Sequence, residues 1–191
     1  MLTKEEVIAI LQETEALLEG HFLLTSGKHS DRYIQCAQVL QYPEHTETLC
    51  RAMAEPFQNQ GITTVVGPAM GGILLAYEVA RQLGAKAIFT ERENGKMTLR
   101  RNFSVSPGEK VLVVEDVVTT GGSVKEVITL LQELGAELVG AACLVQRSLE
   151  LMDLAGVPLT PLLNLAVTAY EPDQCPLCKE GTPAVKPGSR T

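Results

Sequence analysis

Short apolar runs alternate with longer amphipathic segments along the middle of the chain. Runs rich in Val, Ile, Leu and Ala predict five strands, at residues 63–67, 85–90, 110–116, 137–145 and 161–167. Apolar residues at helical spacing predict helices over 73–83 and 123–134, and a glycine follows each of them. Alternating strands and helices predict a mostly parallel sheet with helices on both faces. Near-continuous apolar runs are typical of strands buried on both sides.

The N-terminal part of the chain has a less regular pattern. Apolar residues at rough helical spacing predict a helix over residues 3–19 that ends at Gly20. A strand is predicted around residues 33–37, and a second helix over residues 44–60. Pro56 is expected to kink or shorten that second helix, because proline cannot continue the hydrogen-bond ladder.

Length and composition favour one globular domain with an appendage. The chain has 191 residues, of which 45% are hydrophobic and 20% charged. We assign residues 1–170 to the domain. Residues 171–191 are rich in Pro, Gly and Cys and are predicted to form an irregular extension.

Charge and cysteine content narrow the classes of function and compartment. A net charge of −7 and a sequence pI of about 5.0 argue against general nucleic-acid binding. No signal peptide and no apolar run long enough to span a bilayer are found in the sequence, so no membrane partner is expected. Five cysteines cannot all pair within one chain, which favours a reduced, cytoplasmic location.

The segment VLVVEDVVTTGGSV, residues 111–124, carries the clearest chemical signal. An apolar strand ends in Glu115 and Asp116, and the loop from Thr119 to Ser123 then enters a helix. Glycines allow a close backbone approach to a ligand, and N–H groups at a helix N-terminus bind phosphate. Taken alone, such a loop is also compatible with a solvent-exposed turn and a helix cap.

Two carboxylates beside a phosphate cradle need a different partner, because they repel a phosphate. The vicinal hydroxyls of a ribose are one candidate, and a divalent cation is the other. The combination predicts a ribose 5-phosphate ligand. The segment contains neither the Walker A pattern nor the G-x-G-x-x-G pattern of dinucleotide-binding folds.

This segment resembles the fingerprint of the type I phosphoribosyltransferases: four apolar residues, two acids, two apolar residues, Thr and a small-residue loop. The resemblance implies the type I phosphoribosyltransferase fold, with a small N-terminal hood over residues 1–42. It also implies binding of 5-phosphoribosyl 1-diphosphate (PRPP). The residues implied to bind PRPP through this segment are Glu115, Asp116, Val117, Val118, Thr119, Thr120, Gly121, Gly122 and Ser123.

Other segments resemble the orotate phosphoribosyltransferases in particular, over roughly residues 3–168. HFLLTSGKHSDRYIQ resembles their N-terminal segment, and CLVQRSLE places an arginine where the family has one against orotate. The resemblance implies transfer of the phosphoribosyl group from PRPP to orotate, giving orotidine 5′-phosphate and diphosphate. It implies a Mg²⁺ cofactor carried on PRPP, near Asp116. The residues implied to bind orotate are Thr119, Arg147, Lys28 and Tyr33.

FTERENGKMTLRRNF takes the place of the family's mobile catalytic loop. Arg92 and Lys96 are candidates for the diphosphate, with a hinge at Gly95, and we group both with Asp116 as catalytic. In the family this loop often closes over the neighbouring subunit's site, which implies a homodimer. A solvated, salt-bridged loop is the alternative for these cations.

The sequence also departs from the family. Thr25 and the run Met70-Gly71-Gly72 stand where many members have lysines, and the segment over 89–103 has no histidine. Two alternatives therefore stay open: transfer to a purine or to uracil, and a PRPP-sensing regulator without catalysis.

The remaining cysteines and histidines give weaker signals. Cys175 and Cys178 form a single C-x₂-C pair, whereas a zinc site needs four ligands, so we expect reduced thiols. A zinc ion shared between two chains and a redox pair stay open as alternatives. His21, His29 and His45 are scattered along the chain. His29, in TSGKHS, could approach a ligand, but a surface histidine is the favoured interpretation.

Overall fold

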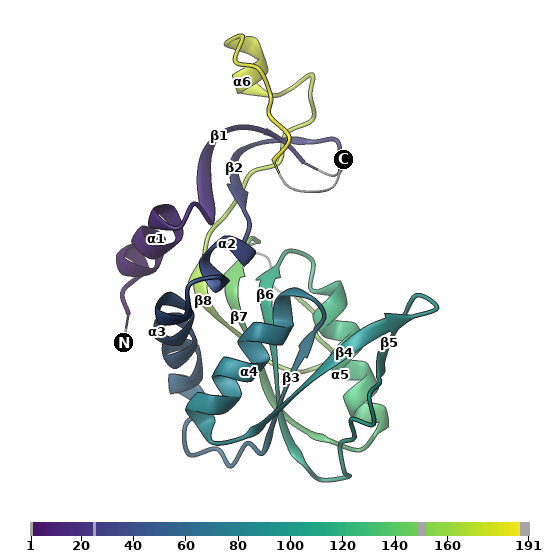
Figure 1. Cartoon of the computed structure of the whole chain (residues 1–191). Helices are drawn as coiled ribbons and strands as arrows, with labels where there is room; N and C mark the ends of the chain where they lie inside the picture. The colour runs from purple at the N-terminus through teal and green to yellow at the C-terminus, as the bar shows by residue number, and fades with distance from the viewer. Residues whose placement is uncertain (1, 25, 149–151, 188–191) are drawn as a thin grey trace.

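The computed structural model describes residues 2–24, 26–148 and 152–187. Its centre is a six-stranded sheet with the strand order β5-β4-β3-β6-β7-β8 (Figure 1). All neighbouring strands in it are parallel except the β4–β5 pair. The strands are β3 (Thr64–Pro68), β4 (Lys86–Glu93), β5 (Lys96–Leu99), β6 (Lys110–Val118), β7 (Glu137–Gln146) and β8 (Leu159–Asn164). The predicted α/β fold with a mostly parallel sheet is confirmed.

Helices cover both faces of this sheet. On one face, α3 (Pro43–Ala54) and α4 (Gly71–Leu83) pack with Leu112 and Val114 of β6. On the other face, α5 (Gly122–Glu133) packs with Val111 and Val113. Successive side chains of a strand point to opposite faces, so β6 contributes alternately to the two cores. Because both faces of β6 are buried, nearly every position of this strand takes an apolar residue.

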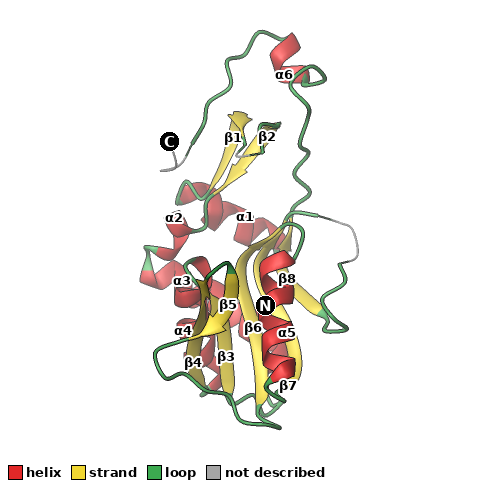
Figure 2. Cartoon of the chain, turned by 90° about the vertical axis from the view of Figure 1, so that its right-hand side faces the viewer, coloured by secondary structure: helices red, strands yellow, loops and turns green. Residues whose placement is uncertain are grey.

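The N-terminal segment forms a hood above the sheet. It consists of α1 (Lys4–Glu13), the antiparallel strands β1 (Leu17–Leu23) and β2 (His29–Ile34), and α2 (Ala37–Leu40). The β1–β2 hairpin lies beyond the carboxyl ends of the parallel strands (Figures 1 and 2). A ligand held at that edge therefore lies beneath the hood.

The predicted helix over 3–19 is wrong in its second half. The helix ends at Glu13, and Glu15 follows it with φ 55°. The Thr14 hydroxyl donates to the Ile10 carbonyl, which helps to close the last turn. Leucines 17 and 18, which fit a helical spacing, belong instead to β1, where the pairing with β2 overrides the local pattern.

Two other boundaries also differ from prediction. The strand placed at 33–37 ends at Ile34, because the chain turns into α2 soon afterwards. The helix placed at 44–60 ends at Ala54 and continues as a short 3₁₀ turn, η1 (Glu55–Phe57), which contains Pro56. Shortening at that proline is thus confirmed.

The segment that takes the place of the mobile loop and the C-terminal extension both contain regular structure. Residues 91–109 contain β5, which pairs antiparallel with β4. The C-terminal extension contains α6 (Pro176–Lys179). Tyr170, which directly precedes the extension, and Val185 within it each form an isolated β-bridge with the hood hairpin. Among the helices of the described chain, none has the length and apolarity needed to cross a membrane.

Candidate active site

The strand order places a ligand crevice between β3 and β6. From β3 the chain crosses to β4 on one side, whereas from β6 it crosses to β7 on the other. The loops that follow β3 and β6 therefore diverge and leave a crevice at the carboxyl ends of these strands. The two acids lie near the carboxyl end of β6, and the loop after β6 carries the hydroxyls and glycines.

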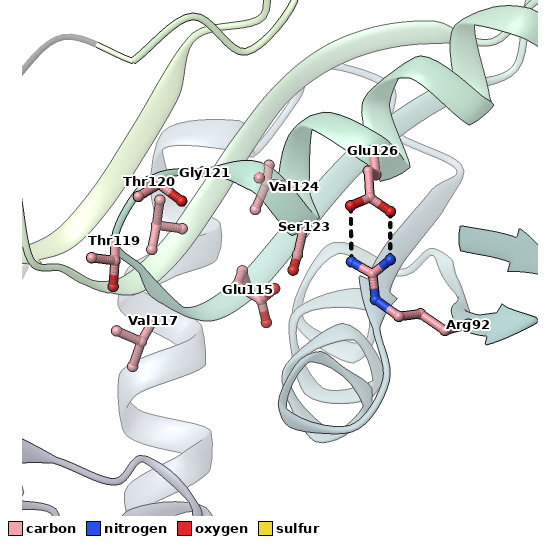
Figure 3. A pocket seen from close by; sticks show the side chains of 11 residues that line it. Arg92, Glu115, Val117, Thr119, Thr120, Gly121, Ser123, Val124 and Glu126 are labelled. Atoms are coloured by element: carbon pink, nitrogen blue, oxygen red, sulfur yellow. Dashed lines mark hydrogen bonds and ion pairs between the residues drawn. The ribbon is translucent and has the colours of Figure 1, made fainter. Parts of the chain in front are cut away.

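A cavity of about 350 Å³ lies at the junction of β6 and α5 (Figure 3). Gly121 precedes α5 with φ 77°, and a Cβ there would lie 2.8 Å from the Leu154 side chain, so glycine is required. The first N–H groups of α5 have no intrahelical partner, which makes this end a suitable anion site. The residues that line the cavity are Arg92, Glu115, Val117, Val118, Thr119, Thr120, Gly121, Gly122, Ser123, Val124 and Glu126.

The two acids at the end of β6 have different environments. Glu115 is only 9% exposed, and burial raises its pKa to about 8, with a further contribution from the neighbouring Asp116. The Asp116 N–H donates to Glu115 Oε1 at 3.2 Å, and the Val117 N–H donates to Asp116 Oδ1 at 2.7 Å. Near neutral pH, Glu115 thus favours the protonated form, in which its carboxyl group can donate a hydrogen bond.

A second cavity, of about 600 Å³, lies between the hood and the end of the sheet. It brings together Tyr33 of β2, Asp116 and Thr119 of the β6 end, and Arg147, which directly follows β7. Its lining also includes Leu24, Ser26, Ile34, Gln35, Cys36, Ala37, Val117, Val167 and Ala169. Val117 and Thr119 line both cavities, so a single ligand complex can extend from one into the other.

Arg147 has an unsatisfied donor in this second cavity. Its backbone N–H donates to the Val118 carbonyl at 2.9 Å, which holds it beside β6. Its side-chain Nε is buried and finds no hydrogen-bond partner within the described part of the chain. Burial lowers the pKa of Arg147, although an arginine side chain stays protonated in proteins. A buried cationic donor of this kind calls for an acceptor from a ligand.

The remaining predicted site residues lie in three different places. Arg92 lines the first cavity and forms a bidentate ion pair with Glu126 of α5, at 2.8 and 2.9 Å (Figure 3). Lys96 lines a separate cavity along the outer side of α5. Lys28 pairs with Glu171 at 2.9 Å and is not among the residues found to line the second cavity. Thr25 lies outside the described residues.

Sequence reasoning missed Glu126 as the partner of Arg92. The spacing of Glu126 from Ser123 places it about one helical turn into α5, on the side of the first cavity. That spacing was visible in the sequence, but the hairpin that carries Arg92 to α5 was not. Nothing in the sequence indicated that His21 is buried, yet its side chain is only 4% exposed.

Comparison with known proteins identifies relatives along nearly the whole chain. The model of the phosphoribosyl transferase domain matches residues 36–155. Orotate phosphoribosyltransferase of Desulforamulus reducens is 62% identical over 189 residues, covering 99% of this chain and 98% of the relative. That of Thermotoga maritima is 56% identical over 181 residues, covering 95% and 96%.

Solved structures share the fold. Orotate phosphoribosyltransferase from Aeropyrum pernix superposes with a TM-score of 0.72 at 28% identity, covering 83% of this chain and 93% of that one. Adenine phosphoribosyltransferase from Rhodothermus marinus gives 0.64 at 26% identity, covering 83% and 99%. The architecture is therefore common to enzymes named for different bases, while the full-length sequence identity is to those named for orotate. The chain belongs to the orotate phosphoribosyltransferase family of type I phosphoribosyltransferases.

Proposed function

We propose that this protein transfers the 5-phosphoribosyl group of PRPP to orotate, giving orotidine 5′-phosphate and diphosphate in pyrimidine biosynthesis. The observation that carries the proposal is the buried, unpartnered Nε of Arg147 in a cavity continuous with a phosphate cradle. A planar guanidinium suits a planar ligand that bears a carboxylate. Tyr33 and Thr119 line the same cavity and complete the proposed orotate contacts.

The reaction replaces one bond at C1 of the ribose by another. The C1–O bond to diphosphate breaks and leaves its electron pair on the diphosphate. A C1–N bond forms from a ring nitrogen of orotate, which loses its proton. Orotate is already an anion, so the site does not need a strong base; it needs positioning and charge stabilisation. The hood, which covers the cavity, helps to exclude water.

The β6–α5 segment supplies the proposed contacts to PRPP. The loop from Thr119 to Ser123 holds the 5-phosphate by backbone N–H groups and hydroxyls. Asp116 accepts from one ribose hydroxyl, and protonated Glu115 donates to the other. The carboxyl groups of these two adjacent residues thereby act as one hydrogen-bond acceptor and one donor, which suits a pair of vicinal hydroxyls.

The donor set suits a Mg²⁺ ion that arrives with PRPP. Among the described residues that line the second cavity, where we place orotate, Asp116 is the one acidic residue. Mg²⁺ is commonly held by one or two carboxylates together with substrate phosphates. Asp116 would orient the ion, which would neutralise part of the charge of the leaving diphosphate when bound.

The diphosphate contacts are proposed to come from the β4–β5 hairpin. Arg92 is already at the phosphate cavity, so a diphosphate competes with Glu126 for its guanidinium. Lys96 points elsewhere within one chain, and the site of a neighbouring subunit is its proposed target. Both residues therefore keep the catalytic role proposed from sequence.

The chain is proposed to act as a cytoplasmic homodimer. Three large apolar side chains of α4 and the residue preceding it are exposed and share one helical face: Met70, Leu74 and Tyr77. Light scattering is expected to give twice the chain mass, and a monomer at working concentration would contradict this assignment. We propose residues 1–170 as the catalytic domain, with the hood over 1–42, and 171–191 as an extension.

A panel of bases tests the function. Purified protein with PRPP and Mg²⁺ is expected to consume orotate and release diphosphate, with little turnover of adenine, hypoxanthine or uracil. Preference for a purine or uracil would overturn the choice of acceptor. PRPP binding without diphosphate release for any base would favour a regulator instead.

A further inference from the structure

Four potential metal ligands meet where the C-terminal extension touches the hood. They are His21 of β1, His29 of β2, and Cys175 and Cys178 at the start of α6. Their ligand atoms all lie within 4.8 Å of one another. His21 and Cys175 are buried, and Cys178 lies on the exposed side. None of the four lines either cavity of the candidate active site.

The spacing of these atoms is close to that of a tetrahedral zinc site. His21 Nε2 lies 3.5 Å from Cys175 Sγ and 3.7 Å from Cys178 Sγ, and His29 Nδ1 lies 3.2 Å from Cys178 Sγ. Bond lengths of about 2.05 Å to nitrogen and 2.3 Å to sulfur give nitrogen–sulfur separations of roughly 3.5 Å in a tetrahedron. The two nitrogens, at 2.7 Å, need to move apart by a fraction of an ångström to admit the ion.

The second nitrogen of His21 is already bound in the manner of a metal ligand. Its Nδ1 lies 2.6 Å from the Thr182 carbonyl oxygen, which can only accept a hydrogen bond. The proton of the neutral ring therefore resides on Nδ1, and Nε2 presents its lone pair to the other three ligand atoms, those of His29, Cys175 and Cys178. Metal-ligating histidines commonly use their second ring nitrogen in this way, which fixes the tautomer and the ring orientation.

The extension lies against both outer edges of the hood hairpin. The N–H groups of His29 and Tyr170 each donate to the carbonyl of the other at 2.8 Å, beside β2. Beside β1, the Leu23 N–H donates to the Val185 carbonyl and the Val185 N–H to the His21 carbonyl, again at 2.8 Å. The segment that carries α6 spans these two edges above the hairpin (Figures 1 and 2).

This extension lacks an apolar core of its own. From 168 to 187, all of them described, Cys175 is the one buried residue. A segment this small cannot bury enough apolar surface to hold a fixed conformation, and natural proteins commonly add a metal or a disulfide in such cases. The cysteines are unpaired thiols, and the cluster contains two histidines that a disulfide would not use.

We propose that His21, His29, Cys175 and Cys178 of one chain bind a single structural Zn²⁺ ion that fastens the extension to the hood. Two thiols release their protons when the ion binds as two thiolates and two neutral imidazoles. Four protein ligands leave no open position, which is the mark of a structural zinc site and not of a catalytic one. Thiolate and imidazole ligands also favour zinc over Mg²⁺ or Ca²⁺.

Metal analysis of the full chain, purified under reducing conditions and without a polyhistidine tag, tests the proposal. About one zinc ion per chain is expected. Cys178→Ser and His29→Ala are each expected to lose most of that zinc. Cys50→Ala and His45→Ala are matched controls that remove a thiol or an imidazole outside the cluster, and they are expected to retain it.

Cobalt titration of the reduced, metal-stripped wild-type chain keeps the test independent of how the variants fold. A tetrahedral ligand-field spectrum with thiolate charge-transfer bands of two sulfurs is expected. Failure of the reduced wild-type chain to bind either metal would overturn the proposal, as would half an ion per chain, which indicates a site shared between two chains. Equal zinc loss in Cys50→Ala would overturn the ligand assignment.

Discussion

The Asp116 carboxylate packs directly against Gly71, so that a Cβ at position 71 would overlap it. Asp116 lies near the carboxyl end of β6, whereas Gly71 begins α4 after the loop that follows β3. This contact joins the two loops on either side of the crevice. Absence of a side chain at 71 therefore sets where the proposed ribose-binding carboxylate lies.

Gly71→Ala is expected to displace Asp116 and to lower kcat/KM for PRPP by roughly 10- to 100-fold, since small displacements of binding groups have effects of that size. Steady-state kinetics of Gly71→Ala, Asp116→Asn and the double variant check this expectation. If the glycine acts through Asp116, the double variant is little worse than Asp116→Asn alone. Fully additive losses would contradict that coupling.

Glu115 is expected to make the fold less stable as the pH rises. Its folded pKa of about 8 lies above its ordinary value of 4.5, so the unfolded chain releases this proton first as the pH rises. Stability from this group is fully present below pH 4.5, is lost between about pH 4.5 and 8, and changes little above.

Glu115→Gln keeps the shape but cannot ionise. The variant is expected to gain stability relative to wild type between pH 5 and pH 8, by on the order of a few kcal/mol. Denaturant unfolding of both proteins at several pH values measures this difference. A difference that does not change with pH would show that Glu115 has an ordinary pKa.

Arg147→Ala is expected to raise KM for orotate by roughly 10- to 100-fold, the loss that corresponds to hydrogen bonds from a charged group. KM for PRPP should change much less. Arg32→Ala is the matched control, because Arg32 also lies in the hood region but pairs with Glu19 at 3.6 Å and does not line the cavity. A larger effect on PRPP than on orotate would reverse the proposed placement of the two substrates.

Substitutions of Arg92 and Glu126 test whether Arg92, on the β4–β5 hairpin, contacts the diphosphate of PRPP. Arg92→Ala is expected to lower kcat/KM for PRPP about 10-fold or more, because a charged contact to the substrate is lost. Glu126→Gln removes the carboxylate that competes for the guanidinium, although Arg92 still donates to the Gly95 carbonyl, and it is expected to leave PRPP affinity equal or stronger.

The same hairpin supplies a control for this pair. Arg101 forms a similar bidentate pair with Glu91, at 2.9 Å for both contacts, and does not line the phosphate cavity. Arg101→Ala is therefore expected to keep near-normal kinetics. Equal losses in Arg92→Ala and Arg101→Ala would indicate that both pairs serve only to hold the hairpin.

Contiguous residues determined the fold class and the phosphate-binding segment. The central strands β3, β6 and β7 are largely buried on both faces, so their sequences are mostly apolar and were predicted within a few residues. The stretch from Glu115 to Ser123 is one strand end and one helix start, and local chain geometry alone brings its acids, hydroxyls and N–H groups together.

Tertiary structure decided what depends on contacts between distant parts of the chain. Whether Leu17 and Leu18 lie in a helix or a strand depends on their pairing with β2. The spacing of apolar residues around them gives no information about that pairing. Arg92 reaches α5 only because β5 turns the chain back on itself. His21 and Cys175 are 154 residues apart, so no sequence spacing could reveal that they meet. The sequence thus determined the sheet and the loop from Thr119 to Ser123. The packing of the hood against the sheet and against the extension determined the second cavity and the cluster of histidines and cysteines.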